Sequence, residues 1–226
     1  MELIHVLNRG VDKRDIFLDD QDYFRAILDI YEFNNQDHAN TVLYSFNISS
    51  LDVGRPKIPK VAKQRKVLVD ILAFCLVPNH YHMLLSPRVE NGVTLFMKKF
   101  NGGYAKYFNE RYHRTGALFQ GKYKRIILKN EAHFIHLPYY IHFNPLDLIM
   151  PEWRDGKLRN YEKAIHFLEE YRWSSHLDYA GIKNFPSITN RKLLTDFFNR
   201  QNGYKKSIKG WLRELDIGEE QRFILE

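Results

Sequence analysis

The pattern of apolar and polar residues predicts strands and helices in turn along the chain. Residues 3–7 and the apolar, β-branched run 67–77 are typical of strands. Apolar residues at three- and four-residue spacing predict a helix over 21–33, with Asp19 and Asp20 offering an N-cap. Further helices are predicted over residues 93–112, 131–143, 161–171, 192–201 and 205–215. The final part of the chain is therefore predicted to be helical.

A tight turn at Pro78 and Asn79 joins the 67–77 strand to a second strand that begins at His80. Side chains alternate between the faces of an extended strand, so His80 and His82 point one way and Tyr81 the other. Two imidazoles on one face can share a divalent metal. Since isolated His-x-His pairs are common, the pair alone favours two histidines on an edge strand.

Tyr140 and Asn144 lie four residues apart at the end of the 131–143 helix and share a helix face. A phenol beside a metal-polarised phosphate can attack phosphorus, and an amide oxygen at i+4 can complete the metal shell. On spacing alone, a packed tyrosine and an asparagine C-cap explain the pair better. Pro138 lies inside the same helix, where we expect it to kink the helix or to restart it at Tyr139.

Composition is that of a globular protein with a basic balance. The 226 residues are 44% hydrophobic, enough for one large domain or for one domain with an appendage. Cys75 is the only cysteine, which excludes an intramolecular disulfide and a multi-cysteine zinc site. The N-terminus has no basic-then-apolar leader pattern, and no apolar run has the length of a membrane span. We therefore expect a cytoplasmic protein that does not bind membranes.

The positive charge is concentrated in one stretch. Residues 98–129 hold nine Lys or Arg against one acid, a local excess of +8 compared with +7 for the whole chain. Tyrosines and phenylalanines are interleaved with these cations, a mixture that suits single-stranded nucleic acid. A solvated helix face with core aromatics explains many of the residues individually, but explains their concentration less well.

Five ordered motifs are spread along residues 1–180. They are Leu7–Val11 with Asp15–Leu18, Phe74–Leu85, Tyr104–Asn109 with Arg114–Lys124, Tyr140–Pro145, and Tyr171–Ser175. Together they resemble the IS200-like (Y1) tyrosine transposases of the HUH endonuclease superfamily, and most closely the REP-associated tyrosine transposases. The resemblance implies an α+β fold: a ferredoxin-like antiparallel sheet with helices on one face, here followed by a C-terminal helical extension.

The resemblance also implies a chemistry. His80, His82 and Asn144 would bind Mg²⁺ or Mn²⁺, and Tyr140 would be the nucleophile. The tyrosine would attack single-stranded DNA with hairpin ends, form a 5′-phosphotyrosine and release a 3′-hydroxyl that can rejoin strands. Both monomers and homodimers occur in the family, so the oligomeric state stays open. We assign DNA contacts to nine basic residues: Arg9, Lys98, Lys99, Lys106, Arg111, Arg114, Lys122, Lys124 and Arg125.

The chain also departs from the family pattern. We predict a transposase domain over 1–180 and a helical extension over 181–226. Residues 49–66 form a predicted basic loop that is longer than expected and adds a DNA contact or only lengthens a hairpin. After Asn144-Pro145, an acid at Asp147 stands where the family has a basic residue, which changes the phosphate contacts expected near the nucleophile.

Three alternatives stay open. The chain could be a non-cleaving hairpin DNA- or RNA-binding protein derived from a transposase. It could instead be a replication or conjugation relaxase, which would place the tyrosine helix and the histidine strand in a circularly permuted order. Tyr104 and Tyr107, in the basic stretch, are rival nucleophiles, although neither matches the motif around Tyr140.

Overall fold

The computed structural model describes residues 1–37, 65–128, 131–200 and 203–214. The β-prone segment 41–48 and most of the predicted basic loop 49–66 lie outside these residues. The strands are β1 (Ile4–Arg9), β2 (Val69–Val77), β3 (His80–Pro87) and β4 (Lys124–Ile127). The α-helices are α1 (Asp20–Phe33), α2 (Gly92–Arg111), α3 (Glu131–Phe143), α4 (Tyr161–Glu170), α5 (His176–Tyr179), α6 (Lys192–Arg200) and α7 (Tyr204–Glu214). Short 3₁₀ turns are η1 (Val11–Lys13), η4 (Asn144–Leu148) and η5 (Pro151–Arg154).

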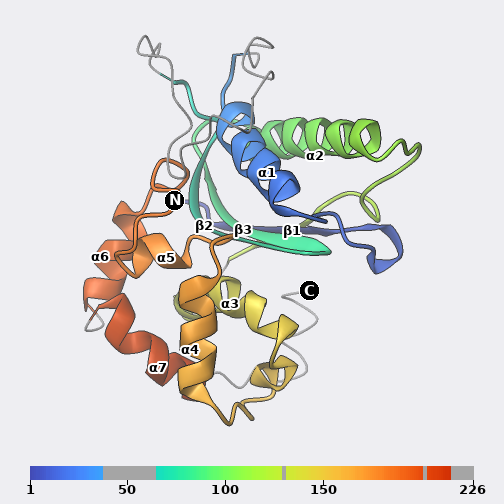
Figure 1. The fold of residues 1–226 in the computed structure, drawn as a ribbon. Coiled ribbons are helices and arrows are strands. Elements are labelled where there is room, and N and C mark those ends of the chain that lie inside the picture. The colour runs from blue at the N-terminus through green and yellow to red at the C-terminus, as the bar shows by residue number, and fades with distance from the viewer. Residues whose placement is uncertain (38–64, 129–130, 201–202, 215–226) are drawn as a thin grey trace.

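The four strands form one antiparallel sheet in the order β2-β3-β1-β4. The chain order β1-α1-β2-β3-α2-β4 then gives two β-α-β units side by side, with β1 and β3 in the centre (Figure 1). The hairpin between β2 and β3 turns at Pro78 and Asn79, as the sequence predicted. The expected ferredoxin-like α+β class is confirmed.

Helices α1 and α2 cover one face of the sheet, which we call the α1/α2 face (Figure 1). Its core contains Val6 of β1 and Tyr81 and Met83 of β3, each at 0% exposure, packed among the apolar side chains of both helices. Asp19 caps α1 by accepting hydrogen bonds from the backbone N–H groups of Gln21 and Asp22. The predicted N-cap is therefore correct, and it satisfies donors that an uncapped helix would leave unpaired.

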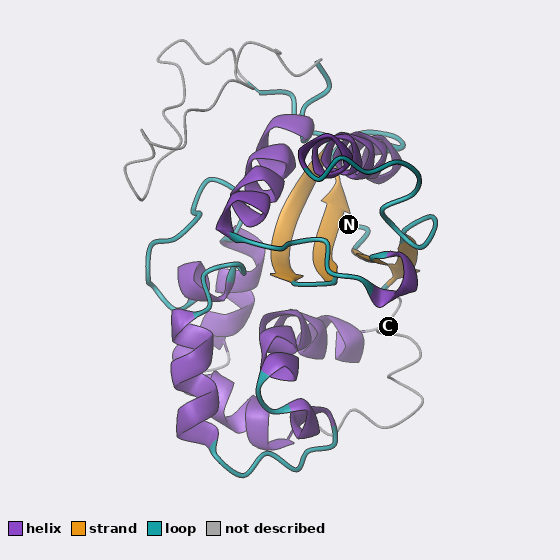
Figure 2. Cartoon of the chain, turned by 45° about the vertical axis from the view of Figure 1, so that its right-hand side comes forward, coloured by secondary structure: helices purple, strands orange, loops and turns teal. Residues whose placement is uncertain are grey.

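Helices also cover the opposite face of the sheet. The sequence predicted helices on one face only, so the structure has one layer more than expected. Helix α3 packs on β2 and β3 there, and α4, α6 and α7 continue the same core (Figure 2). We call this the α3 face. This second layer forms because alternate residues of β2 and β3, among them Ala73, Cys75 and Leu84, are apolar and point away from α1 and α2. Leaving these side chains exposed to water would cost about 25 cal/mol for each Å² of apolar surface.

Helix α3 continues through Pro138 without interruption, so the expected restart at Tyr139 is wrong. A buried polar network joins α3 to the C-terminal helices. The Tyr204 hydroxyl lies 2.8 Å from His142 Nδ1 and 2.7 Å from His176 Nδ1, and His142 Nε2 lies 2.8 Å from Ser175 Oγ. The division into 1–180 and 181–226 stays a prediction, although α7 shares a core with α3. Among the described helices, none is long and apolar enough to cross a membrane.

Candidate active site

His80 and His82 lie on the α3 face of β3, and their rings meet edge-on with centroids 5.0 Å apart. Tyr81, between them, points to the other face, where its hydroxyl donates to Asn101 Oδ1 at 2.6 Å and its ring packs edge-on against Phe100. The alternation predicted from the sequence is therefore observed. His80 is 6% exposed and His82 1%, so the two are not histidines on an exposed edge strand.

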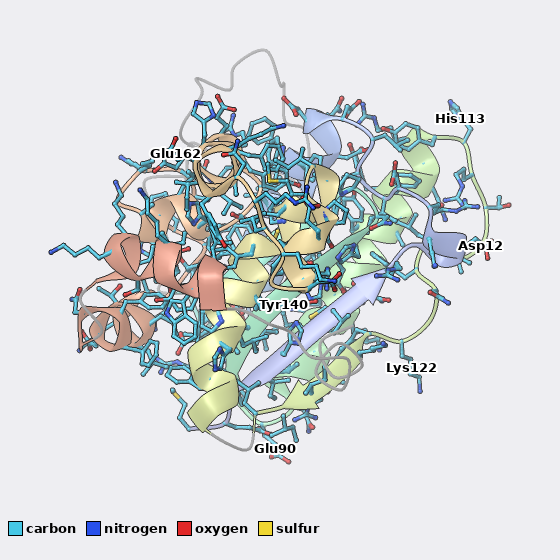
Figure 3. The ribbon with its side chains drawn as sticks, turned by 90° about the horizontal axis from the view of Figure 1, so that it is seen from below. Asp12, Glu90, His113, Lys122, Tyr140 and Glu162 are labelled. Carbon is cyan, nitrogen blue, oxygen red and sulfur yellow. The ribbon has the colours of Figure 1, made fainter. Side chains whose placement is uncertain are left out.

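Tyr140 reaches the histidines from α3. Its ring stands perpendicular to that of His82, with centroids 5.6 Å apart, and Tyr140 is 1% exposed. In the view from the α3 side, Tyr140 lies over the sheet beside β1 (Figure 3). The packing of α3 on β2 and β3 thus brings together residues 60 positions apart in the sequence.

Asn144 contacts both the end of α3 and His80. Its Nδ2 donates to the Tyr140 carbonyl at 2.9 Å, which caps the end of α3. This bond fixes the orientation of the amide, so Oδ1 must point the other way. Oδ1 lies 3.3 Å from His80 Nε2. The cap therefore presents the amide oxygen to the histidine.

The donor set formed by His80, His82 and Asn144 fits a divalent cation. Burial lowers the pKa of His80 to about 4, with a further contribution from nearby Arg9, so the ring is neutral at pH 7. His80 Nδ1 lies 2.5 Å from Asn79 Oδ1 and donates to it. The Nε2 lone pair then faces the Asn144 oxygen, and two ligands about 3 Å apart are suitably spaced for one ion bound at about 2.1 Å. In the described part of the chain, no group of three or more His, Cys, Asp or Glu side chains could hold a metal. An ion here would thus depend on the amide oxygen.

His5 belongs to this cluster and was not predicted from the sequence. It comes from β1, is fully buried, and stacks on His82 with its Nε2 2.9 Å from His82 Nδ1. Burial lowers the pKa of His5 to about 3, so one neutral ring donates to the other. When His82 donates through Nδ1, its Nε2 keeps a lone pair for a metal. Only the β1–β3 pairing reveals this contact, because nothing in the sequence near His5 specifies its partner strand.

Arg154 and Asp147 also complete the site without having been predicted. Arg154, at the end of η5, donates from Nη1 to the Tyr140 hydroxyl at 2.9 Å and from Nη2 to Asn144 Oδ1 at 3.4 Å. Asp147 binds the same guanidinium through both oxygens, at 2.8 and 2.6 Å. The one sequence signal was the acid at Asp147 in place of a basic residue, which predicted altered phosphate contacts and did not point to Arg154.

The rival tyrosines lie on the opposite side of the sheet. Tyr104 is fully buried on the α1/α2 face and its hydroxyl donates to the Ile16 carbonyl, while that of Tyr107 donates to Asp22 at 3.0 Å. Burial raises the pKa of both phenols, and the Asp22 carboxylate adds to the rise. Neither tyrosine can approach the histidines without unfolding of the sheet layer.

The predicted DNA-contacting residues are not gathered on one surface. Lys98, Lys99, Lys106 and Arg111 are on α2, across the sheet from Tyr140. Arg111 is bound to Asp19 and Asp22, each at 2.6 Å, and Lys99 donates to the Asn35 and Asp37 carbonyls, so these two side chains hold α2 to α1 and to the residues after it. Lys122 projects at the margin of the molecule (Figure 3) and Arg114 donates to Asn109 Oδ1 at 3.3 Å.

Arg9 and Lys124 do lie on the α3 face. In the sheet register Arg9 pairs with His80, and Leu7 pairs with both His82 and Lys124. Directly paired residues point to the same face, so two cations extend the histidine rows toward the sheet edge. Arg125 pairs with Val6 instead, points to the α1/α2 face, and donates to Glu2 at 3.3 Å.

Comparisons with known proteins found a family model and a solved structure that are similar to the chain. The family model of the IS200-like transposases matches residues 56–144, the segment that carries His80, His82, Tyr140 and Asn144. No curated protein sequence matches the chain. A solved structure of a REP-associated tyrosine transposase bound to a REP hairpin is similar, with 11% identity, 82% coverage of both chains and a TM-score of 0.43. The resemblance to IS200-like transposases is confirmed.

Proposed function

We propose that the protein is a metal-dependent endonuclease and strand transferase that acts on hairpin-bearing single-stranded DNA, as a REP-associated tyrosine transposase does. One observation carries the proposal. The Asn144 side chain, oriented by its bond to the Tyr140 carbonyl, brings an amide oxygen to 3.3 Å from His80 Nε2 beside the Tyr140 ring. A nucleophile and a metal-compatible donor set therefore share one small volume.

In the proposed reaction the Tyr140 oxygen attacks a phosphodiester phosphorus. The new bond joins the phenolic oxygen to phosphorus, and the bond from phosphorus to the 3′-oxygen breaks. The phenol loses its proton to water, and the released 3′-oxygen takes a proton from water. Since a phosphotyrosine conserves the energy of the diester, attack by a 3′-hydroxyl reverses the step and joins strands without ATP.

His80, His82 and Asn144 would hold Mg²⁺ or Mn²⁺. When bound, such an ion polarises the scissile phosphate and neutralises charge that develops on it. The protein's own contribution is to keep both imidazoles neutral through burial and to fix the amide oxygen through the helix cap. Arg9 and Lys124, in the same sheet rows as the histidines, would contact the phosphates of the bound strand.

A second function is favoured by the burial of the nucleophile. Tyr140 is 1% exposed and its hydroxyl accepts a hydrogen bond from Arg154, so a phosphate reaches it only after local rearrangement. A chain that never rearranges would bind hairpin DNA or RNA without cutting it. The relaxase alternative is disfavoured, because the histidine strand β3 precedes the tyrosine helix α3 in the chain.

Covalent trapping tests the proposal. The protein is incubated with single-stranded hairpin DNA and Mn²⁺, and an SDS-resistant adduct is sought by gel electrophoresis. We expect an adduct that disappears with EDTA and in Tyr140→Phe. Hairpin binding that survives EDTA with no adduct on any palindromic substrate would instead identify a non-cleaving binding protein.

A further inference from the structure

Arg154 makes a set of contacts that links the nucleophile to the metal-compatible oxygen. One terminal nitrogen donates to the Tyr140 hydroxyl at 2.9 Å and the other lies 3.4 Å from Asn144 Oδ1. Asp147 holds the guanidinium through two hydrogen bonds, and Asp147 Oδ1 also accepts from Trp153 Nε1 at 2.7 Å. The Arg154 side chain is 12% exposed and that of Asp147 26%, so the ion pair lies at the edge of the buried cluster.

The chemistry of a guanidinium limits what Arg154 can do. Arginine stays protonated in proteins, so it can donate to the tyrosine oxygen and cannot accept the tyrosine proton. A charged donor stabilises a phenolate more than a phenol, and the effect grows with burial. Burial alone would lower the pKa of Arg154, but its bonds to Asp147 and Tyr140 raise it above the usual value.

The same contacts explain the acid at position 147. A carboxylate beside a nucleophile that attacks phosphate would by itself repel the substrate. Asp147 is instead bound in a bidentate ion pair with Arg154, with a shortest distance of 2.6 Å, and the member of the pair that contacts the Tyr140 hydroxyl is the guanidinium. The acid thus orients a cation supplied from η5.

We propose that Arg154, oriented by Asp147, is a positioning residue that holds the Tyr140 hydroxyl in one orientation on the α3 face. The role rests on the proposed function of Tyr140 as nucleophile. It predicts that loss of the guanidinium impairs the attack on phosphorus more than it impairs DNA binding.

The contact itself is tested without DNA. Tyrosines are labelled with ¹³C at the ring carbon bearing the hydroxyl, and the Tyr140 signal is assigned from Tyr140→Phe. In Arg154→Gln at a fixed neutral pH we expect this signal to move and to broaden, because the phenol oxygen loses the charged donor that holds it in one orientation. Arg159→Gln removes an exposed arginine of the following loop and is expected to leave the signal unchanged. An unchanged Tyr140 signal in Arg154→Gln overturns the proposal.

The catalytic consequence is tested by adduct kinetics at saturating DNA. Arg154→Gln is expected to slow adduct formation about 10- to 100-fold, with hairpin affinity changed less than about twofold. Arg154→Lys and Asp147→Asn should form the adduct faster than Arg154→Gln and more slowly than the unsubstituted protein. Arg159→Gln should form it at the rate of the unsubstituted protein. A rate of adduct formation in Arg154→Gln equal to that of the unsubstituted protein would overturn the proposal. If the unsubstituted protein forms no adduct, the proposed function fails, and the NMR signal of Tyr140 in Arg154→Gln still decides whether Arg154 positions Tyr140.

Discussion

Asn144 donates to the carbonyl of Tyr140 at 2.9 Å and thereby turns its amide oxygen toward His80 Nε2, 3.3 Å away. One side chain thus ends the helix that carries the proposed nucleophile and offers a ligand to the proposed metal. Because the two roles use opposite ends of the amide, they can be separated by experiment.

Asn144→Ala is expected to lower the free energy of unfolding by about 1 kcal/mol through loss of the cap, and to weaken Mn²⁺ binding at least about tenfold. Asn160→Ala is the matched control, because Asn160 caps α4 by accepting from the Lys163 N–H and lies in another element. It should cost about as much stability and leave Mn²⁺ binding intact. Calorimetric Mn²⁺ titration and thermal unfolding of both variants decide whether Asn144 is more than a cap.

Tyr140→Phe and Tyr104→Phe are expected to have opposite effects. The first should abolish the covalent adduct and change stability little. The second should keep the adduct and lower the free energy of unfolding by about 1–3 kcal/mol, because the buried Ile16 carbonyl loses its donor. Gel analysis of adducts with urea unfolding checks both, and an adduct formed by Tyr140→Phe would reject Tyr140 as the nucleophile.

The two faces of the sheet should differ in their contribution to DNA affinity. Lys124→Gln, on the α3 face, is expected to weaken hairpin binding and to reduce the slope of log K against log salt by about 0.7, the value for one single-strand phosphate contact. Lys106→Gln, on α2 and paired with Glu110 at 3.7 Å, should change neither quantity. Fluorescence anisotropy at several salt concentrations measures the slopes. A larger effect from Lys106 would show that DNA binds across the α1/α2 face.

Stability should fall in mild acid because of the network between α3 and the C-terminal helices. Burial lowers the pKa of His176 to about 4, with a contribution from Lys205, and burial and His176 lower that of His142. Below pH 6.5 the unfolded chain binds protons that the folded chain excludes. The stability contributed by each neutral histidine is therefore present above pH 6.5 and is lost as pH falls toward 4, by about 1.4 kcal/mol per pH unit.

His176→Asn should reduce that slope by about 1 kcal/mol per pH unit, whatever its effect on stability at pH 7. His113→Asn removes an exposed histidine and should leave the slope unchanged. Urea unfolding between pH 7 and 4.5 measures both. An unaltered slope in His176→Asn would show that His176 does not contribute to the acid sensitivity.

The sequence by itself predicted β1, β2 and β3, the main helices and the histidine alternation on β3, and its resemblance to the IS200-like transposases named the four residues of the candidate site. The strands and helices follow from local rules: periodicity, turn residues and capping. Tertiary structure alone decided that the basic stretch is divided between two faces, that Tyr104 and Tyr107 lie away from the histidines, and that His5, Asp147 and Arg154 complete the cluster. Those outcomes depend on strand register and on which helix covers which face, and both are set by long-range packing that no local pattern encodes.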